Sequence, residues 1–337
     1  MKLVQGAGLA LCATLSVSML AACGSAAGGE DGGATKTLKV AFNQPEGHPQ
    51  FVAMEELGEK LNERTGGAYD IQVFPNELLG SQQETITGVQ SGSIDMSIVV
   101  GSLMENVNPD FVAFDLPYVF ESSEQQMSVL NDPEITGDLY SSMEEQGIHV
   151  AGAFHSGVRN VYTKDKAVPT PSDLSGQKIR VIQNDTMVEM MNLMGGVGTA
   201  MGQGDVYTAI QSGVLDGGEN NELIYNGLKH DEVAPHYTYT QHLMVPDYLI
   251  VNSDLYEGMS EEHRAVFEEE FAAAVDSEVA LWETSVEEAK AAAEEAGAEF
   301  HEIDTAPFKE AVQPLVDSKL EGSDEARKLY DAAQAAK

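Results

Sequence analysis

Cysteine is nearly absent from this sequence. Only Cys12 and Cys23 occur among 337 residues, and both lie within the first 23. The rest of the chain therefore has no disulfide framework and no thiolate metal site. Basic residues are also scarce, with 18 Lys and Arg against 55 Asp and Glu, which gives a formal net charge of −37. Because contacts with phosphates need a basic surface, we expect no nucleic acid partner.

Sequence signatures of common enzymes are missing as well. No HExxH, CxxC, Walker A or GxSxG sequence occurs, and the glycine-rich run 195–202 places Met201 where a GxGxxG motif needs its last glycine. The histidines are scattered, and His230, His236 and His242 are six residues apart, which is not ligand spacing on a helix. We therefore expect no catalytic residue, no metal and no cofactor.

The N-terminal segment is typical of a secretory signal. Lys2 precedes an apolar stretch from Leu9 to Leu20 that is too short to span a membrane and ends in small residues. The sequence 20–23, Leu-Ala-Ala-Cys, resembles the bacterial lipobox, which implies that residues 1–22 are a signal peptide and that Cys23 is lipidated. An ordinary signal peptide with an incidental cysteine is the alternative. The composition of residues 23–36 predicts a flexible tether. No later stretch is apolar for about 18 residues, so we expect no membrane span there.

Strand and helix patterns alternate along the rest of the chain. The first unit is predicted to contain strands 37–42, 69–74 and 94–100 with helices 48–66 and 82–90. The second is predicted to contain strands 149–154, 178–183, 214–217 and 242–252 with helices 186–194 and 206–212. A long helix over 260–296 and a helical stretch over 307–336 follow. This order predicts two α/β units, and because no linker separates them, we expect the chain to cross between them by strands.

Arginine is rare after Cys23, and two of the five residues stand apart. Arg159 follows the predicted strand 149–154, and Arg180 lies inside the apolar strand 178–183. A guanidinium binds a carboxylate through two parallel hydrogen bonds, so both are candidates for holding an anion. For Arg180 the alternative is a pair with an internal Asp or Glu. The other three lie in acidic helical stretches and predict surface ion pairs: Arg64, Arg264 and Arg327.

Two asparagines are placed where open α/β sheets bind ligands. Asn220 follows a short strand in a glycine-rich turn, and Asn43 ends the first strand. Ligands of such sheets bind outside the carboxyl ends of the strands. Each asparagine is alternatively a turn former.

Several segments resemble the solute-binding proteins of TRAP (tripartite ATP-independent periplasmic) transporters, the DctP-like family that includes C4-dicarboxylate and sialic-acid binders. The resemblance runs from about Thr37 to Phe308 and rests on order and spacing rather than on any one motif. The matching segments are 74–80, 90–96, 114–120, 157–160, 171–181, 206–213 and 215–220.

The resemblance implies a two-lobed fold of the periplasmic-binding-protein type II class, with hinge strands and a long C-terminal helix. It implies that Arg180 clamps a ligand carboxylate, that Arg159 assists, and that Asn220 and Asn43 contribute to the cleft. Further candidates for the lining are Phe154, His155, Gln183, Tyr207, Asn221, Tyr225 and Tyr248.

Three departures from the family pattern bear on the ligand. Val100 or Gly101 stands where sialic-acid binders carry a cleft Glu, Gln203 replaces an aromatic residue, and Asn221 replaces a Pro. A sialic-acid ligand is therefore disfavoured. A smaller carboxylate such as a dicarboxylate, a keto acid or a sugar acid fits better.

The sequence thus predicts the substrate-binding subunit of a TRAP transporter, which captures a small organic acid and delivers it to membrane permease subunits. We expect lobe I to comprise 37–156 and about 245–284, and lobe II to comprise about 157–244 and 285–337 with the C-terminal helices. The protein is expected outside the cytoplasm, held to the membrane by a lipid on Cys23. A ligand-sensing partner of a membrane receptor is one alternative, and a secreted hydrolase or lyase is another.

Overall fold

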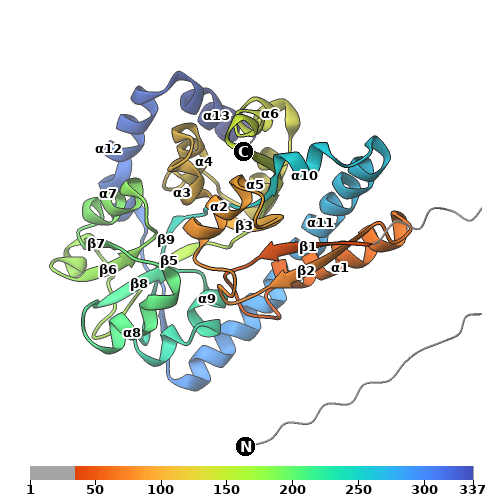
Figure 1. Cartoon of the computed structure of the whole chain (residues 1–337). Helices are drawn as coiled ribbons and strands as arrows, with labels where there is room; N and C mark the ends of the chain where they lie inside the picture. Colours follow the sequence, from red (N-terminus) through yellow and green to blue (C-terminus); the bar gives the residue numbers. More distant parts are fainter. Residues whose placement is uncertain (1–34, 337) are drawn as a thin grey trace, which may run out of the picture. The chain divides into compact units, whose positions relative to one another are not determined.

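The structure of the protein is a computed structural model that describes residues 35–336 (Figure 1). The predicted signal peptide over 1–22 and the lipidation site Cys23 lie outside the described residues, as does nearly all of the tether predicted over 23–36. Within the described part, no helix has both the length and the apolar character needed to cross a bilayer.

Five strands form the first sheet, in the order β2-β1-β3-β10-β4. Strands β1 to β3 are parallel, as expected for successive β-α-β units, whereas β10 enters antiparallel between β3 and β4. The bounds are β1 Lys36–Ala41, β2 Tyr69–Phe74, β3 Met96–Val100, β4 Ile148–Phe154 and β10 Asp247–Asn252.

Six strands form the second sheet, in the order β11-β9-β5-β8-β6-β7. Strand β5 runs antiparallel to both β8 and β9, and the outer pairs β6–β7 and β9–β11 are parallel. The bounds are β5 Arg159–Thr163, β6 Lys178–Val181, β7 Val197–Ala200, β8 Gly217–Asn220, β9 His236–Leu243 and β11 Glu299–His301.

Helices cover both sheets. The longest, α11, begins after the capping residue Ser260 and ends at Gly297, whose left-handed φ of 103° a glycine adopts without strain. The bounds are α1 Pro49–Arg64, α2 Gln82–Gln90, α3 Gly101–Glu105, α4 Val112–Asp115, α5 Ser123–Leu130, α6 Pro133–Ser141, α7 Asp185–Leu193, α8 Val206–Gln211, α9 Glu222–Gly227, α10 Ser253–Glu257, α11 Glu261–Ala296, α12 Ala306–Gly322 and α13 Asp324–Ala335.

The chain passes between the sheets by two short strand-to-strand segments, as the sequence predicts. Residues 155–158 lead from β4 to β5, and residues 244–246 lead from β9 to β10. Helix α11 makes a third connection, because it packs against α1 beside the first sheet and against α9 beside the second. The C-terminal helices divide: α12 packs on α7, whereas α13 lies against α4 and α5 of the first lobe, although the sequence places 285–337 with the second.

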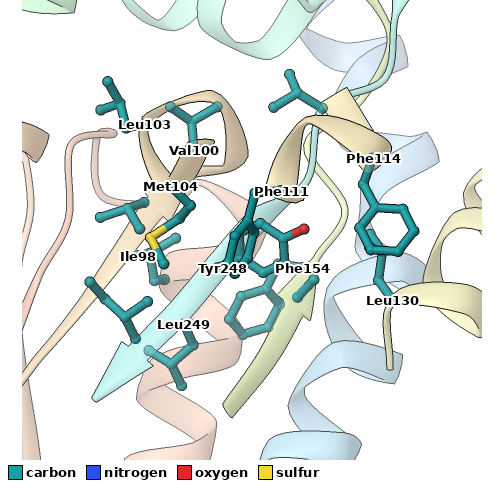
Figure 2. Close-up of a cluster of buried hydrophobic side chains, with 14 of the residues drawn as sticks. Ile98, Val100, Leu103, Met104, Phe111, Phe114, Leu130, Phe154, Tyr248 and Leu249 are labelled. Atoms are coloured by element: carbon teal, nitrogen blue, oxygen red, sulfur yellow. The ribbon is translucent and has the colours of Figure 1, made fainter. Parts of the chain in front are cut away.

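The core of the first lobe surrounds β10 (Figure 2). Both faces of this central strand are buried, which is why its sequence is apolar without alternation. Tyr248 packs edge-on against Phe111, and Phe154 packs edge-on against Phe271. Both Tyr248 and Phe154 are fully buried among hydrophobic side chains.

Three sequence predictions need correction. The strand expected at 214–217 lies at 217–220, because the backbone N–H groups of Val214 and Leu215 donate hydrogen bonds to the carbonyl of Ala209 and close the turn after α8. The apolar stretch 242–252 is not one strand but the end of β9, a crossing and β10. The helical stretch 307–336 is interrupted at Ser323, which is extended and caps α13.

Candidate ligand-binding site

A polar cavity lies where the carboxyl ends of β1, β3 and β6 meet the two crossings. Its walls carry two arginines, two carboxylates and a group of amide and hydroxyl side chains. The lining residues are Asn43, Gln44, Glu77, Ser81, Gln82, Val100, Leu103, Ser156, Arg159, Arg180, Ile182, Gln183, Gly202, Gln203, Asn220, Ile224 and Asp247. Placement at the strand ends follows the rule for open α/β sheets.

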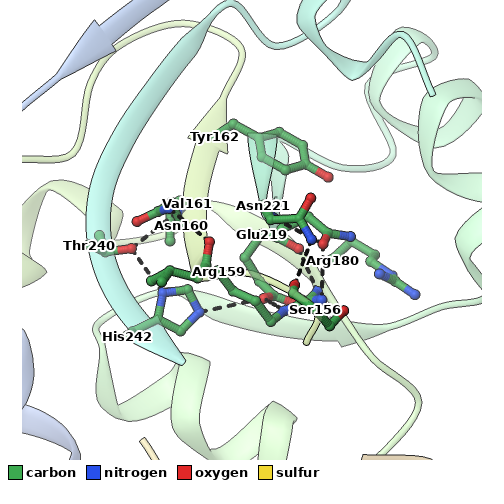
Figure 3. Close-up of polar contacts among 12 residues, drawn as sticks. Ser156, Arg159, Asn160, Val161, Tyr162, Arg180, Glu219, Asn221, Thr240 and His242 are labelled. Atoms are coloured by element: carbon green, nitrogen blue, oxygen red, sulfur yellow. Dashed lines mark hydrogen bonds and ion pairs between the residues drawn. The ribbon is translucent and has the colours of Figure 1, made fainter. Parts of the chain in front are cut away.

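Arg159 is fixed by a buried carboxylate on the neighbouring strand (Figure 3). Its Nε and Nη2 donate to the two carboxylate oxygens of Glu219 at 2.5 and 2.7 Å, and Nη1 donates to Asn220 Oδ1 at 3.0 Å. The Glu219 carboxylate also lies 3.5 Å from His242 Nε2. Burial alone raises the pKa of Glu219, but Arg159 and His242 outweigh it and lower that pKa to about 2. The Arg159 charge is therefore already neutralised within the protein.

Arg180 has no such partner. It lies in β6 with only 4% of its surface exposed, and its single hydrogen bond runs from Nε to the carbonyl of Met201 at 2.8 Å. Its two terminal nitrogens contact no acceptor among the described residues, so four N–H donors remain for a ligand. Burial lowers the pKa of the Arg180 guanidinium, because the charged form loses its hydration. An anion in the cavity would restore the lost stabilisation of that charge.

The floor of the cavity is formed by the two crossings. Ser156 Oγ, from the first, donates to Asp247 Oδ2, at the end of the second, at 2.9 Å. Gln50, at the start of α1, donates to the same oxygen at 3.0 Å and to the carbonyl of His155 at 2.9 Å. Burial raises the pKa of Asp247, while these two donors partly counteract it. Asp247 Oδ1 accepts no hydrogen bond from any residue between 35 and 336, and it remains available to a donor.

A second carboxylate, Glu77, comes from the loop after β2. Asn76 and Glu77 both have a left-handed φ of 56°, and the Glu77 carboxylate accepts from the backbone of Gly204 in the second lobe. Burial raises the pKa of Glu77, and the nearby positive charge of Arg180 partly counteracts this effect. Glu77 is therefore a hydrogen-bond acceptor that lies near Arg180.

Side chains from the two lobes touch across the cavity mouth. Gln203 Nε2 donates to Gln44 Oε1 at 2.9 Å, and Asn43 Nδ2 donates to Gln203 Oε1 at 3.5 Å. On the other side, Asn184 Nδ2 donates to the carbonyl of Ser102 at 2.9 Å. The cavity thus enclosed has a volume of about 30 Å³, room for about two or three waters. A solute of sugar size enters only if the lobes separate, which is a hinge movement about the crossings.

The structure brings five predicted site residues together at the cavity: Arg159, Arg180, Asn220, Asn43 and Gln183.

Six other candidates lie elsewhere. Phe154 and Tyr248 are fully buried members of the hydrophobic core of the first lobe. His155 and Tyr225 are likewise buried, bonded to Gln126 and to the carbonyl of Ala234.

Tyr207 and Asn221 have structural contacts instead of cavity positions. Tyr207 lies on the outer face of α8 and donates to Glu232 at 3.1 Å, since Val206 and Ile210 occupy the buried face. Asn221 caps α9 and donates to the carbonyl of Ser156 at 2.7 Å, which holds the first crossing in place.

Sequence reasoning missed most of the amide, hydroxyl and carboxylate side chains that line the cavity. Gln44 follows Asn43 directly, and Asp247 opens the last strand of the first sheet. A polar residue at a strand end was the available signal for both. Glu77 and Gln203 carried a weaker signal, as members of the family-like segment 74–80 and of a departure from the family pattern.

Comparison with known proteins identifies the family. Residues 40–322 match DctP, bacterial extracellular solute-binding protein, family 7. The chain belongs to this family. The protein is accordingly an extracytoplasmic solute-binding protein and not an enzyme, and its two-sheet fold with a long C-terminal helix is the type II binding-protein fold.

Three relatives illustrate the match. A TRAP periplasmic solute-binding protein from Anaerococcus prevotii, solved with bound D-glucuronate, is 41% identical with a TM-score of 0.86, covering 89% of this chain and 97% of that one. The corresponding protein from Xanthobacter autotrophicus, solved with β-D-galacturonate, is 31% identical with a TM-score of 0.85, covering 89% and 100%. The C4-dicarboxylate-binding periplasmic protein DctP of Rhodobacter capsulatus is 30% identical, covering 84% of each chain.

Proposed function

We propose that this solute-binding protein captures a hexuronate, a sugar acid with one carboxylate and several hydroxyl groups. The observation that carries the proposal is the buried, unpaired guanidinium of Arg180 in a cavity otherwise lined by hydroxyl, amide and carboxylate groups. The carboxylate of the ligand would take two parallel hydrogen bonds from the terminal nitrogens of Arg180.

The charges of the cavity favour one ligand carboxylate over two. Arg159 is neutralised by Glu219, so Arg180 is the one cationic side chain of the lining that forms no hydrogen bond or ion pair with a carboxylate between residues 35 and 336. A C4-dicarboxylate would place its second carboxylate near Asp247 and Glu77, where like charges repel. The same two carboxylates are suitable acceptors for sugar hydroxyls.

The amides complete a surface for hydroxyl groups. Asn43, Gln44 and Gln203 carry amide donors and acceptors at the mouth. At the floor, the side-chain nitrogen of Asn220 remains a donor, because its Oδ1 accepts from Arg159 and from the Asn221 amide, and the Ser156 hydroxyl, which donates to Asp247, remains an acceptor. The A. prevotii and X. autotrophicus proteins, with bound glucuronate and galacturonate, support the same ligand class.

Isothermal titration calorimetry tests the proposal directly. The purified protein is titrated with D-glucuronate, D-galacturonate, succinate, pyruvate and D-glucose. We expect a hexuronate to bind and the neutral sugar and succinate to bind far more weakly. Preference for succinate would assign a dicarboxylate ligand instead. Preference for glucose would show that the protein does not recognise its ligand through a carboxylate.

Arg180→Ala separates the clamp from the rest of the cavity. Removing one partner of a buried charged pair costs at least about 2 kcal/mol, so the affinity should fall by at least about 30-fold. Arg180→Lys should restore only part of it, because an ammonium cannot form the two parallel bonds. Arg64→Ala, which removes an exposed pair with Glu269 and Glu270, is the matched control and should bind normally. Equal affinity of Arg180→Ala and the parent protein would refute the clamp.

We further propose that lipidated Cys23 holds the protein at the membrane, where it delivers the solute to TRAP permease subunits. The lipobox-like sequence 20–23 supports the anchor, and family membership supports the permease. Cys23→Ala should release the protein from the membrane fraction. Vesicles carrying the permease subunits should accumulate the solute only when the binding protein is added. Signalling through a receptor without accumulation would favour a sensing function.

A further inference from the structure

A cluster of two histidines and a glutamate lies on the second sheet at its β9–β11 edge. The cluster consists of His236 on β9 and of Glu299 and His301 on β11, and their ligand atoms all lie within 4.8 Å of one another. None of the three residues lines the solute cavity. We propose that this cluster, here called the β9–β11 site, binds a divalent transition-metal ion such as Zn²⁺.

Strand pairing explains why the three side chains meet. Strands β9 and β11 are parallel, with His236 opposite Glu299 and Thr238 opposite His301. Residues opposite each other, and residues two apart on one strand, project from the same face of a sheet. The intervening residues Tyr237 and Phe300 project from the other face, where their rings pack 5.1 Å apart in the core. The pairing thus anchors one face of the strand pair and leaves the other to the three ligands.

The spacing of the ligand atoms is close to that of a metal site. Glu299 Oε2 lies 3.4 Å from His236 Nδ1 and 3.7 Å from His301 Nε2. Two ligands of a tetrahedral zinc ion with bonds of about 2.0–2.1 Å are about 3.3 Å apart. The glutamate oxygen is within about 0.4 Å of that spacing to each histidine nitrogen. The two histidine nitrogens, which lie within 4.8 Å of each other, would need to approach by at most about 1.5 Å.

The histidine nitrogens that face the cluster lie at ion-pair distance from Glu299 but make no hydrogen bond among the described residues. His236 Nδ1 and His301 Nε2 are both buried from solvent and accept or donate no hydrogen bond within residues 35–336. Buried polar atoms are nearly always paired, and such an orphan calls for an explanation such as an ion. The side chain of Glu299 is 64% exposed, so the cluster opens to solvent and an ion can enter.

The donor set selects the class of metal. Two imidazoles and one carboxylate suit zinc, copper, nickel or cobalt, whereas calcium and magnesium require oxygen ligands. Three protein ligands leave a fourth position for water. A bound ion would also tie the short edge strand β11 to β9, so it should stabilise the folded state.

Calorimetric titration of the full, tag-free chain with Zn²⁺ after removal of metals by chelation tests the site. An excess of Mg²⁺ is present throughout, because it occupies the many surface carboxylates of this acidic chain. We expect one tight equivalent, a rise in melting temperature, and at least a tenfold loss of affinity in His236→Ala and in His301→Ala. His263→Ala, which removes a histidine from α11 away from the site, should bind as the parent does. The parent and all variants contain the same cysteines, so any Zn²⁺ bound by Cys12 or Cys23 is the same in each protein and does not affect the differences between them.

Co²⁺ supplies a second readout that does not depend on stability. Visible absorption bands of a four- or five-coordinate Co²⁺ ion should appear in the parent protein and be lost in Glu299→Gln and His301→Ala. Absence of tight Zn²⁺ binding in the parent, or equal binding by the parent and the two histidine variants, would overturn the site. If a histidine variant melts early in the absence of metal, Glu299→Gln, whose side chain is mostly exposed, decides the question.

Discussion

The buried pair between Arg159 and Glu219 should govern how the protein responds to acid. In Glu219→Gln the Arg159 charge remains buried without its counter-ion, and breaking such a pair costs about 3–5 kcal/mol. The pKa of Glu219 gives an independent magnitude. It falls from the ordinary 4.5 to about 2 in the folded protein, and at about 1.4 kcal/mol for each pKa unit this corresponds to about 3 kcal/mol.

The sign of the pH dependence follows from the direction of that change. A carboxyl whose pKa is depressed by folding stabilises the folded state above its unfolded pKa, and the stabilisation is lost as pH falls toward the folded pKa. The Glu219 contribution should therefore be complete above about pH 5 and disappear between pH 4.5 and about pH 2. The buried carboxyls Asp247 and Glu278 have raised pKa values from burial and act in the opposite sense, so only the difference between parent and variant isolates Glu219.

Chemical denaturation of the parent and of Glu219→Gln at several pH values measures this difference. We expect about 3 kcal/mol at pH 7, equivalent to a melting temperature lower by about 6 °C, and a decreasing gap below pH 4.5. Glu269→Gln, which removes an exposed partner of Arg64, is the matched control and should change little. A Glu219→Gln protein as stable as the parent at pH 7, or a gap that persists at low pH, would refute the reasoning.

Three further substitutions test the crossings, the mouth and the corrected site. Gly157→Ala should lower the free energy of unfolding by about 1–3 kcal/mol, because the added Cβ would lie 2.7 Å from Trp282 and the residue has a left-handed φ of 69°. Gly176→Ala, where φ is 79° and no atom lies within 4 Å of the added Cβ, is the control that measures the backbone strain alone. Gln203→Ala should weaken solute binding by roughly 5- to 10-fold with a faster dissociation rate, because one or two hydrogen bonds between the lobes are lost; unchanged kinetics would show that the mouth contacts carry no binding energy. Tyr207→Phe should leave the affinity unchanged, since its hydroxyl bonds only to side chains on the exposed side of α8, and any loss would return it to the site.

The sequence predicted the parts of this protein that depend on local patterns. Alternation and helical spacing located β2 and α2 without error, and Ser260 marked the start of α11. Arg180 was found because a charged residue inside an apolar strand needs an anionic partner, either within the protein or in a ligand. These signals are contained within a few residues, so no knowledge of the partner strands was needed.

The rest depended on long-range pairing. Tyr248 and Asp247 are neighbours at the start of β10, yet Tyr248 lies in the core and Asp247 lines the cavity. The sequence of a strand that is buried on both faces does not indicate which face meets the cavity, so it could not separate the two residues. That Arg159 and not Arg180 has the internal partner follows from the pairing of β5 with β8. The meeting of His236 with His301 likewise requires the β9–β11 register, which joins residues more than 60 positions apart.

The hydrogen bond from Ser156 to Asp247 joins the two crossings at the floor of the cavity. The atoms that would contact a solute are therefore also the atoms about which the lobes turn. Apparent affinity in such a protein equals the intrinsic affinity of the closed form multiplied by the fraction of molecules able to close. A substitution at Ser156 or Asp247 should therefore change two quantities together, the contacts that the closed form makes with the solute and the fraction of empty molecules that close.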